Sequence, residues 1–167
     1  MKKLYIVRHA KSSWNFPDLS DHDRPLLEKG KKRTKVINDY LIEAVVKVDF
    51  IITSSAVRAK ETARFIARAI EYPLNEIKVD PQIYRADMER LKDQFLDFSD
   101  QFNSIMIVGH NPTFTNFANI FLEPKIDWLP TSGIVCIEFD TTHWDKIFSS
   151  NWTTKFIVTP KALKKEK

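Results

Sequence analysis

The chain has 167 residues, of which 43% are hydrophobic and 29% charged, and this composition is typical of a soluble globular protein. The length suits one domain, which we expect to span residues 1–167 with a flexible basic tail from about residue 160. The net charge of +4 is mild, and a single cysteine excludes an internal disulfide. The apolar runs are too short for a signal-peptide core or a membrane span. These features predict a cytoplasmic protein with no membrane partner.

The sequence lacks two features that would indicate a nucleic-acid ligand or a glycine-rich phosphate loop. The basic tail, "KALKKEK", has no aromatic residue that could stack on a base, so we predict no nucleic-acid partner. Glycine occurs only three times, and neither GxGxxG nor GxxxxGK[ST] is present, which argues against a glycine-rich phosphate loop.

Short apolar segments alternate with segments of helical periodicity along the chain. In chain order, the patterns predict a strand at 4–7, a helix at 28–44, a strand at 49–53, helices at 56–70 and 88–98, a strand at 104–109, a helix at 113–122, and an antiparallel pair of strands at 133–140 and 155–160. Asp87 and Pro112 are suitable first residues for the third and fourth helices. The alternation predicts a three-layer α/β/α sandwich with a mostly parallel central sheet and an antiparallel edge.

Cationic or reactive side chains follow each of the first three predicted strands. Arg8 and His9 end the first strand, Arg58 lies in the first turn after the second, and His110 follows the third directly. Ligands of open α/β sheets bind beyond the carboxyl ends of the strands, so we expect these four residues to gather at one rim if the strands are neighbours.

Two guanidinium groups beside two imidazoles favour phosphoryl transfer. Guanidinium groups bind phosphate through paired hydrogen bonds, and their charge disfavours protonation of a nearby imidazole. A neutral histidine can attack phosphorus and form a phosphohistidine intermediate, and fixed cations stabilise the charge on the equatorial oxygens of the transition state.

The segments "LYIVRHAKSSWN", "TSSAVRAKETA" and "IVGHNP" together resemble the histidine phosphatase superfamily, also called the phosphoglycerate mutase-like or RHG superfamily. The short length, "RHAKS", "DRPLLEKG" and "GHNP" are most similar to the SixA-type phosphohistidine phosphatases. The resemblance implies that His9 is the nucleophile that becomes phosphorylated, and that Arg8, Arg58 and His110 complete the phosphate pocket. It also implies the three-layer fold, with no cofactor and no metal ion.

Two more residues are candidates for substrate binding. Asn15 stands where the family pattern "RHGxxxxN" has its asparagine, so the resemblance implies a further phosphate contact. Ser12 lies near the expected pocket, although a loop hydrogen bond would equally explain it. Trp14 and Phe16 either line the rim of the pocket or anchor its loop, and we favour the anchoring role.

A general acid is missing from the pattern. Many members of the superfamily have Glu or Asp where this chain reads "DPQIYRADMERL". Asp87 is better explained as a helix N-cap, and Glu89 as a solvated side chain. Without an acid, alkoxide leaving groups should react slowly, whereas the imidazole of phosphohistidine, with a pKa of about 6.5, can leave already protonated.

We therefore predict a phosphohistidine phosphatase, acting as a monomer on a phosphorylated protein or a small phosphorylated molecule. The alternatives are a general small-molecule phosphomonoesterase of the same superfamily and a non-catalytic phosphate-binding module. A metal-dependent hydrolase built on His9, His22 and His110 with Asp21 or Asp23 is disfavoured, because no HxH or HExxH spacing occurs and an arginine beside a ligand histidine opposes a cation. Cys136 has no arginine six residues later, as a cysteine phosphatase would need, so we expect it to pack within a strand.

Overall fold

The computed structural model describes residues 1–165 and contains one six-stranded sheet. The strands, in chain order, are β1 (Lys2–Arg8), β2 (Phe50–Ser54), β3 (Lys78–Asp80), β4 (Ser104–Gly109), β5 (Ile134–Phe139) and β6 (Trp152–Val158). Their order in space is β3-β2-β4-β1-β5-β6. The pairs β3–β2, β2–β4 and β4–β1 are parallel, whereas β1–β5 and β5–β6 are antiparallel. The predicted sheet, mostly parallel with an antiparallel edge, is confirmed.

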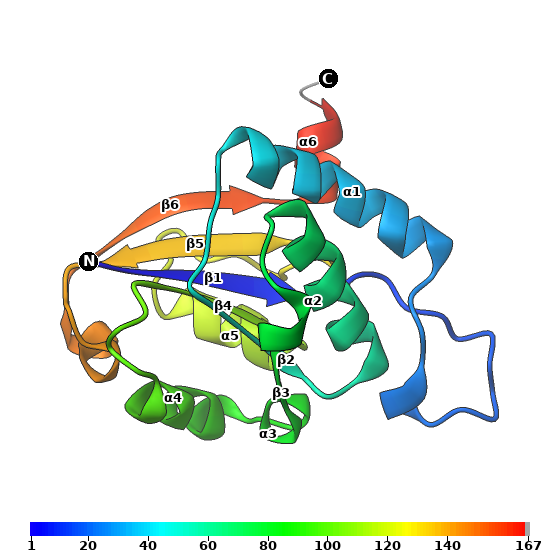
Figure 1. Ribbon diagram of the computed structural model, residues 1–167, viewed down its shortest axis with the longest axis horizontal. Helices are drawn as coiled ribbons and strands as arrows, with labels where there is room; N and C mark the ends of the chain where they lie inside the picture. The colour runs from blue at the N-terminus through cyan, green and yellow to red at the C-terminus, as the bar shows by residue number, and fades with distance from the viewer. Residues whose placement is uncertain (166–167) are drawn as a thin grey trace.

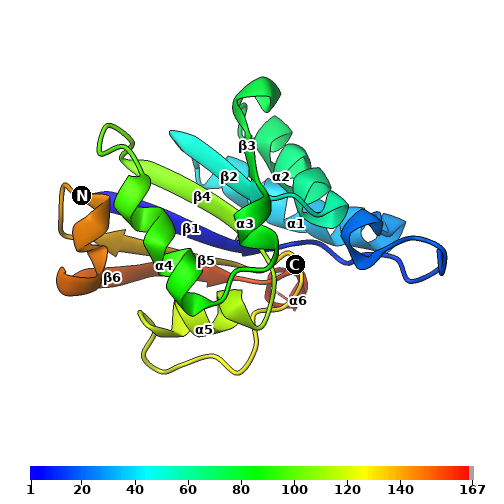
Figure 2. The ribbon, with the colours of Figure 1, turned by 90° about the horizontal axis from the view of Figure 1, so that it is seen from below.

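Helices cover both faces of the sheet (Figures 1 and 2). One face packs against α1 (Glu28–Glu43), α2 (Val57–Ala69) and α6 (Pro160–Lys165). The other face packs against α3 (Pro81–Tyr84), α4 (Met88–Asp97) and α5 (Thr113–Asn119). Three short 3-10 helices complete the fold: η1 (Asp21–Asp23), η2 (Leu74–Glu76) and η3 (Trp144–Ser149).

The strand β1 shows why its sequence is apolar without alternation. Leu4 and Ile6 belong to the core on the α4–α5 face, and Tyr5 and Val7 belong to the core on the α1–α2 face. Successive side chains of a strand point to opposite faces, so a strand covered on both sides needs apolar residues at every position.

The C-terminal segment differs from the expectation of a flexible tail. Residues 160–165 form α6, which contacts α1, and Leu163 packs partly buried against the core on that face. The lysines of this segment therefore flank an apolar anchor. The remainder of the expected tail, 166–167, lies outside the described residues. None of the helices within residues 1–165 combines the length and apolarity that a membrane-crossing segment requires.

The sheet brings the predicted strand ends together. The strands β2, β4 and β1 are neighbours, and Arg8 is in register with Gly109. The backbone N–H of His9 donates a hydrogen bond of 3.1 Å to the Gly109 carbonyl, which places His9 beside the start of the His110 loop. A Cβ atom at Gly109 would collide with the ring of Phe114, so glycine permits this close packing at the exit of β4.

Candidate functional site

A cavity of about 610 Å³, here called the rim cavity, opens at the carboxyl ends of β1, β2 and β4. Its lining includes all six residues that the sequence predicted for the site, namely Arg8, His9, Ser12, Asn15, Arg58 and His110. The rings of His9 and His110 are 5.1 Å apart between centres. The structure therefore brings these side chains together, and their roles in a reaction stay predictions.

The hydrogen bond of His9 determines which ring nitrogen faces the rim cavity. Its Nδ1 atom lies 2.7 Å from the carbonyl oxygen of Ala10, and a carbonyl only accepts, so Nδ1 carries the proton. The Nε2 atom then keeps a lone pair. Burial lowers the pKa of His9 to about 3, and the charges of Arg58 and Arg8 act in the same direction. The imidazole is neutral and can serve as a nucleophile.

His110 is held by a hydroxyl group from β2. Its Nε2 atom lies 2.7 Å from Oγ of Ser54, and that oxygen also accepts a hydrogen bond of 3.1 Å from the backbone N–H of Ala56. The hydroxyl of Ser54 can donate to Nε2 or accept from it, so this hydrogen bond is compatible with either neutral tautomer of His110. Burial lowers the pKa of His110 to about 3, with further lowering by His9 and Arg58, so this ring is neutral too.

Asp21, in η1, is the carboxylate that holds the cationic side of the site. The Nη1 and Nη2 atoms of Arg58 donate to its backbone oxygen at 2.6 Å and to its Oδ2 at 3.0 Å. Tyr84 donates to Oδ2 at 2.6 Å, and Arg24 donates twice to Oδ1, at 2.9 and 3.1 Å. Partial burial would raise the pKa of Asp21, but the hydrogen bonds from Tyr84, Arg58 and Arg24 outweigh it and hold that pKa well below its ordinary value. Asp21 is therefore ionised.

Arg8 is fixed from the other side of the rim cavity. Its Nη1 donates to the carbonyl of Leu129 at 3.2 Å, and the guanidinium lies 5.5 Å from the ring centre of Trp128. The same carbonyl accepts a hydrogen bond of 2.8 Å from Asn111. Burial, followed by the charge of Arg58, lowers the pKa of Arg8.

Three buried polar atoms of the site have no hydrogen-bond partner. The buried side-chain atoms without a hydrogen bond in the described part of the chain are Nε of Arg8, Nε of Arg58, Nδ1 of His110 and Oδ1 of Asn38. Three of these four atoms belong to residues of the rim cavity, and the Nε atoms of Arg8 and Arg58 both carry a hydrogen. Buried donors are seldom left unpaired, so these atoms are suited to an anion with several acceptor oxygens.

The loop between β1 and α1 corrects one expectation. Trp14 and Phe16 are 76% and 52% exposed, so they do not anchor the loop by burial. Trp14 instead lies over the guanidinium of Arg24, 3.5 Å from the ring centre. Ser12 is buried and accepts a hydrogen bond of 2.7 Å from Arg24, whereas Asn15 is exposed at the rim.

Neither carboxylate that the sequence suggested as an acid lines the rim cavity. Asp87 caps α4 through the N–H of Arg90, as predicted, and Glu89 pairs with Lys92. Within residues 1–165, Asp21 is the one carboxylate in the lining, and it is ionised. The position of Asp21 in the site was not predicted. The need for a carboxylate could have been inferred from chemistry, because a buried arginine such as Arg58 requires a counter-charge.

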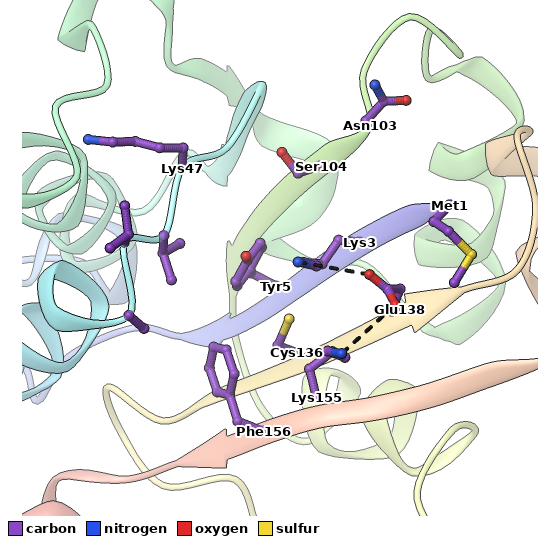
Figure 3. A pocket seen from close by; sticks show the side chains of 13 residues that line it. Met1, Lys3, Tyr5, Lys47, Asn103, Ser104, Cys136, Glu138, Lys155 and Phe156 are labelled. Atoms are coloured by element: carbon purple, nitrogen blue, oxygen red, sulfur yellow. Dashed lines mark ion pairs between the residues drawn. The ribbon is translucent and has the colours of Figure 1, made fainter.

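A different cavity, of about 530 Å³, lies toward the amino end of β1 (Figure 3). It contains Cys136 and the ion pairs that Glu138 makes with Lys3 and Lys155. Burial raises the pKa of the Cys136 thiol to about 12, so it is not a thiolate nucleophile. The expected packing role of Cys136 within a strand is confirmed, since it is buried in β5.

The comparisons with known proteins agree with this geometry. The family model described as histidine phosphatase superfamily, branch 1, matches residues 4–118. An uncharacterized protein of Mycobacterium leprae is 33% identical over 115 residues, which are 67% of this chain and 68% of that protein. A SixA protein from Agrobacterium tumefaciens has a similar structure, with 25% identity, a TM-score of 0.80 and coverage of 95% of this chain and 98% of that one. The protein histidine phosphatase SixA in complex with tungstate matches with 20% identity, a TM-score of 0.80 and coverage of 96% and 99%. The chain thus belongs to branch 1 of the histidine phosphatase superfamily.

Proposed function

We propose that this protein is a phosphohistidine phosphatase that works through a covalent phosphohistidine on His9. The observation that carries the proposal is the pair of unpaired buried N–H donors, Nε of Arg8 and Nε of Arg58, on residues that line one cavity with the neutral imidazole of His9. A phosphoryl group has the oxygens that such donors lack. The similarity to SixA, which was obtained with a bound oxyanion, supports the same conclusion.

The proposed reaction has two steps. First, the second ring nitrogen of the substrate phosphohistidine takes a proton from water, Nε2 of His9 attacks the phosphorus, a P–N bond to His9 forms, and the P–N bond to the substrate breaks, which releases a neutral imidazole. Second, water attacks the phosphorus of phosphorylated His9, the P–N bond to His9 breaks, and inorganic phosphate leaves. In both transition states the charge on the equatorial oxygens increases, and the donors of Arg8, Arg58 and His110 stabilise it.

The substrate class follows from the state of Asp21. An ionised carboxylate has no proton to give, and general acid catalysis is worth about 10²–10⁴ in rate for a poor leaving group. The imidazole of phosphohistidine has a pKa of about 6.5, so it leaves without a donor from the protein. A phosphorylated histidine of a protein therefore fits this site better than an alkyl phosphate.

The test compares kcat/KM for a histidine-phosphorylated protein, a phosphoserine peptide and p-nitrophenyl phosphate. We expect the phosphohistidine substrate to exceed the phosphoserine peptide by at least 10²-fold, because the latter leaves as an alkoxide. Similar values for the two would identify a general phosphomonoesterase. Binding of all three substrates without turnover would identify a phosphate-binding module.

The covalent step has its own test. Brief exposure to ³²P-labelled phosphohistidine substrate should label the wild-type protein, and His9→Ala should abolish both label and turnover. The matched control is His143→Ala, because His143 lies outside the rim cavity and pairs with Asp100 on the surface. Label that survives in His9→Ala would assign the nucleophile to another residue.

A further inference from the structure

A second cavity, of about 360 Å³, adjoins the rim cavity where α1 and α6 meet the loop after α5. Its lining has three cationic side chains, Arg33, Lys161 and Lys164, together with threonines and prolines, and we call it the basic groove. Arg33 and Thr131 line both cavities. The basic groove is therefore a continuation of the proposed catalytic site and not a separate surface.

The charge of the basic groove is not neutralised by the described part of the chain. No carboxylate is among its lining residues, and within residues 1–165 no ion pair or hydrogen bond joins the side chain of Arg33, Lys161 or Lys164 to an acidic group. Lys161 and Lys164 are exposed and stand three residues apart, so they share one side of α6. Leu163, on the same helix, packs against the core and holds α6 in place.

The charged groups of the basic groove favour one class of ligand, an acidic polypeptide. The guanidinium groups of Arg8 and Arg58 are in the rim cavity and Arg33 lies at its boundary with the groove, whereas Lys161 and Lys164 give the rest of the groove exposed ammonium groups, which act as mobile point charges. Point charges spread along a channel suit carboxylates spread along a polypeptide. The groove has no aromatic side chain on which a base could stack, which disfavours a nucleic acid.

We propose that the basic groove binds an acidic segment of the phosphorylated protein substrate while the phosphoryl group occupies the rim cavity. This inference rests on the proposed function and adds the partner's chemistry: carboxylates close in sequence or space to the phosphorylated histidine. Association should weaken with salt, because the lysines are exposed and their charges are screened.

The test measures binding without any phosphoryl group, so it does not depend on turnover. A fluorescein-labelled, unphosphorylated peptide with four consecutive glutamates is titrated with the protein, and anisotropy is recorded. Lys161→Glu/Lys164→Glu should weaken binding about tenfold. The matched control is Lys29→Glu/Lys32→Glu, which changes the net charge equally at two exposed lysines of α1 outside both cavities, and should stay within twofold of the wild type. Lys161→Gln/Lys164→Gln, which adds no negative charge to α6, should weaken binding about threefold.

Turnover gives an independent readout. The ratio of kcat/KM for an acidic phosphohistidine peptide to that for a neutral one should fall about tenfold in Lys161→Glu/Lys164→Glu. Equal losses in the two charge-reversal pairs would overturn the inference, as would displacement of the glutamate peptide by tripolyphosphate or an oligothymidylate at lower concentration than by unlabelled peptide. If phosphohistidine is not hydrolysed but the binding differences hold, the proposed function fails while the anionic partner of the groove stands. If hydrolysis is intact and the binding differences are absent, only the groove is wrong.

Discussion

Replacing Arg58 by lysine keeps the positive charge of the site but removes the planar, forked arrangement of N–H donors that the guanidinium group provides. Arg58, which lines the rim cavity, uses Nη1 and Nη2 for Asp21 and leaves its buried Nε unpaired. A lysine has one nitrogen at the end of a flexible chain, so it cannot hold Asp21 and also present a fixed donor to a phosphoryl oxygen. Loss of one preorganised transition-state donor typically costs about 2.7–4 kcal/mol, or 10²–10³ in kcat.

The same substitution has a smaller effect on folding. Its hydrogen bonds join a charged donor to a carboxylate that is about half exposed, and charged hydrogen bonds contribute about 1.5–3 kcal/mol when fully buried. We therefore expect a loss of about 1–2 kcal/mol in the free energy of unfolding, which a domain with about 5–15 kcal/mol survives. Urea unfolding of the variant checks this value.

The assay is the single-turnover rate of dephosphorylation of a phosphohistidine peptide at saturating enzyme. Arg58→Lys should be 10²–10³-fold slower, nearly as slow as Arg58→Ala. Arg64→Lys is the matched control, since Arg64 is exposed on the same helix and outside the rim cavity, and its rate should equal the wild-type rate. A rate for Arg58→Lys within threefold of the wild type would refute the two-pronged contact and the role of Nε.

Four other outcomes follow from the site. Because burial lowers the pKa of His9 to about 3, the NMR signals of its ring should show no titration near pH 6.5 as pH falls to about 4, and a titration there would contradict the neutral, buried imidazole. Below pH 6.5 the histidines of the unfolded chain become protonated, whereas His9 and His110 of the folded protein stay neutral because burial lowers their pKa values to about 3. The free energy of unfolding should therefore decrease as the pH falls, by at most about 1.4 kcal/mol per pH unit for each histidine. Urea titrations of His110→Gln should show a smaller slope. Asp21→Asn should slow the phosphohistidine substrate and the phosphoserine peptide by one common factor of about ten, because Asp21 positions Arg58; a loss confined to the phosphoserine peptide, whose alkoxide is the poorer leaving group, would make Asp21 an acid instead. Dialysis against EDTA should leave the rate unchanged, because the proposed chemistry uses guanidinium and imidazole groups; restoration of a lost rate by a divalent cation would overturn that statement.

The sheet was predictable because its main signal is local. A strand covered on both faces is continuously apolar, and such runs mark β1, β2 and β4 within two residues of their observed bounds. The strand β3, Lys78–Asp80, escaped prediction because it has three residues, largely exposed, and no pattern to detect. The helix α6 was not predicted because the four lysines of residues 161–167 obscured the apolar anchor at Leu163.

Some residues of the site could likewise be predicted from the sequence, and others could not. Arg8, His9, Arg58 and His110 could be predicted to converge because each follows a strand, and parallel strands end at one edge of the sheet. Asp21, Tyr84 and Ser54 could not, since the hydrogen bonds that make them part of the site depend on where an irregular loop and two short elements lie. A sequence pattern indicates which residues can do chemistry, and the supporting hydrogen bonds require coordinates.

Asp21 links the folding of this site to the choice of substrate. Arg58 and Arg24 are both buried, and a buried cation without a counter-charge is strongly destabilising, so some carboxylate must accompany them. The carboxylate that does so accepts hydrogen bonds from both guanidinium groups and from Tyr84, and these bonds favour its ionised form. The group that allows two arginines to be buried beside the nucleophile is thereby deprived of the proton that an alkoxide leaving group would need. This is the reason for proposing phosphohistidine as the substrate, since its leaving imidazole takes its proton from water and needs no acid from the protein.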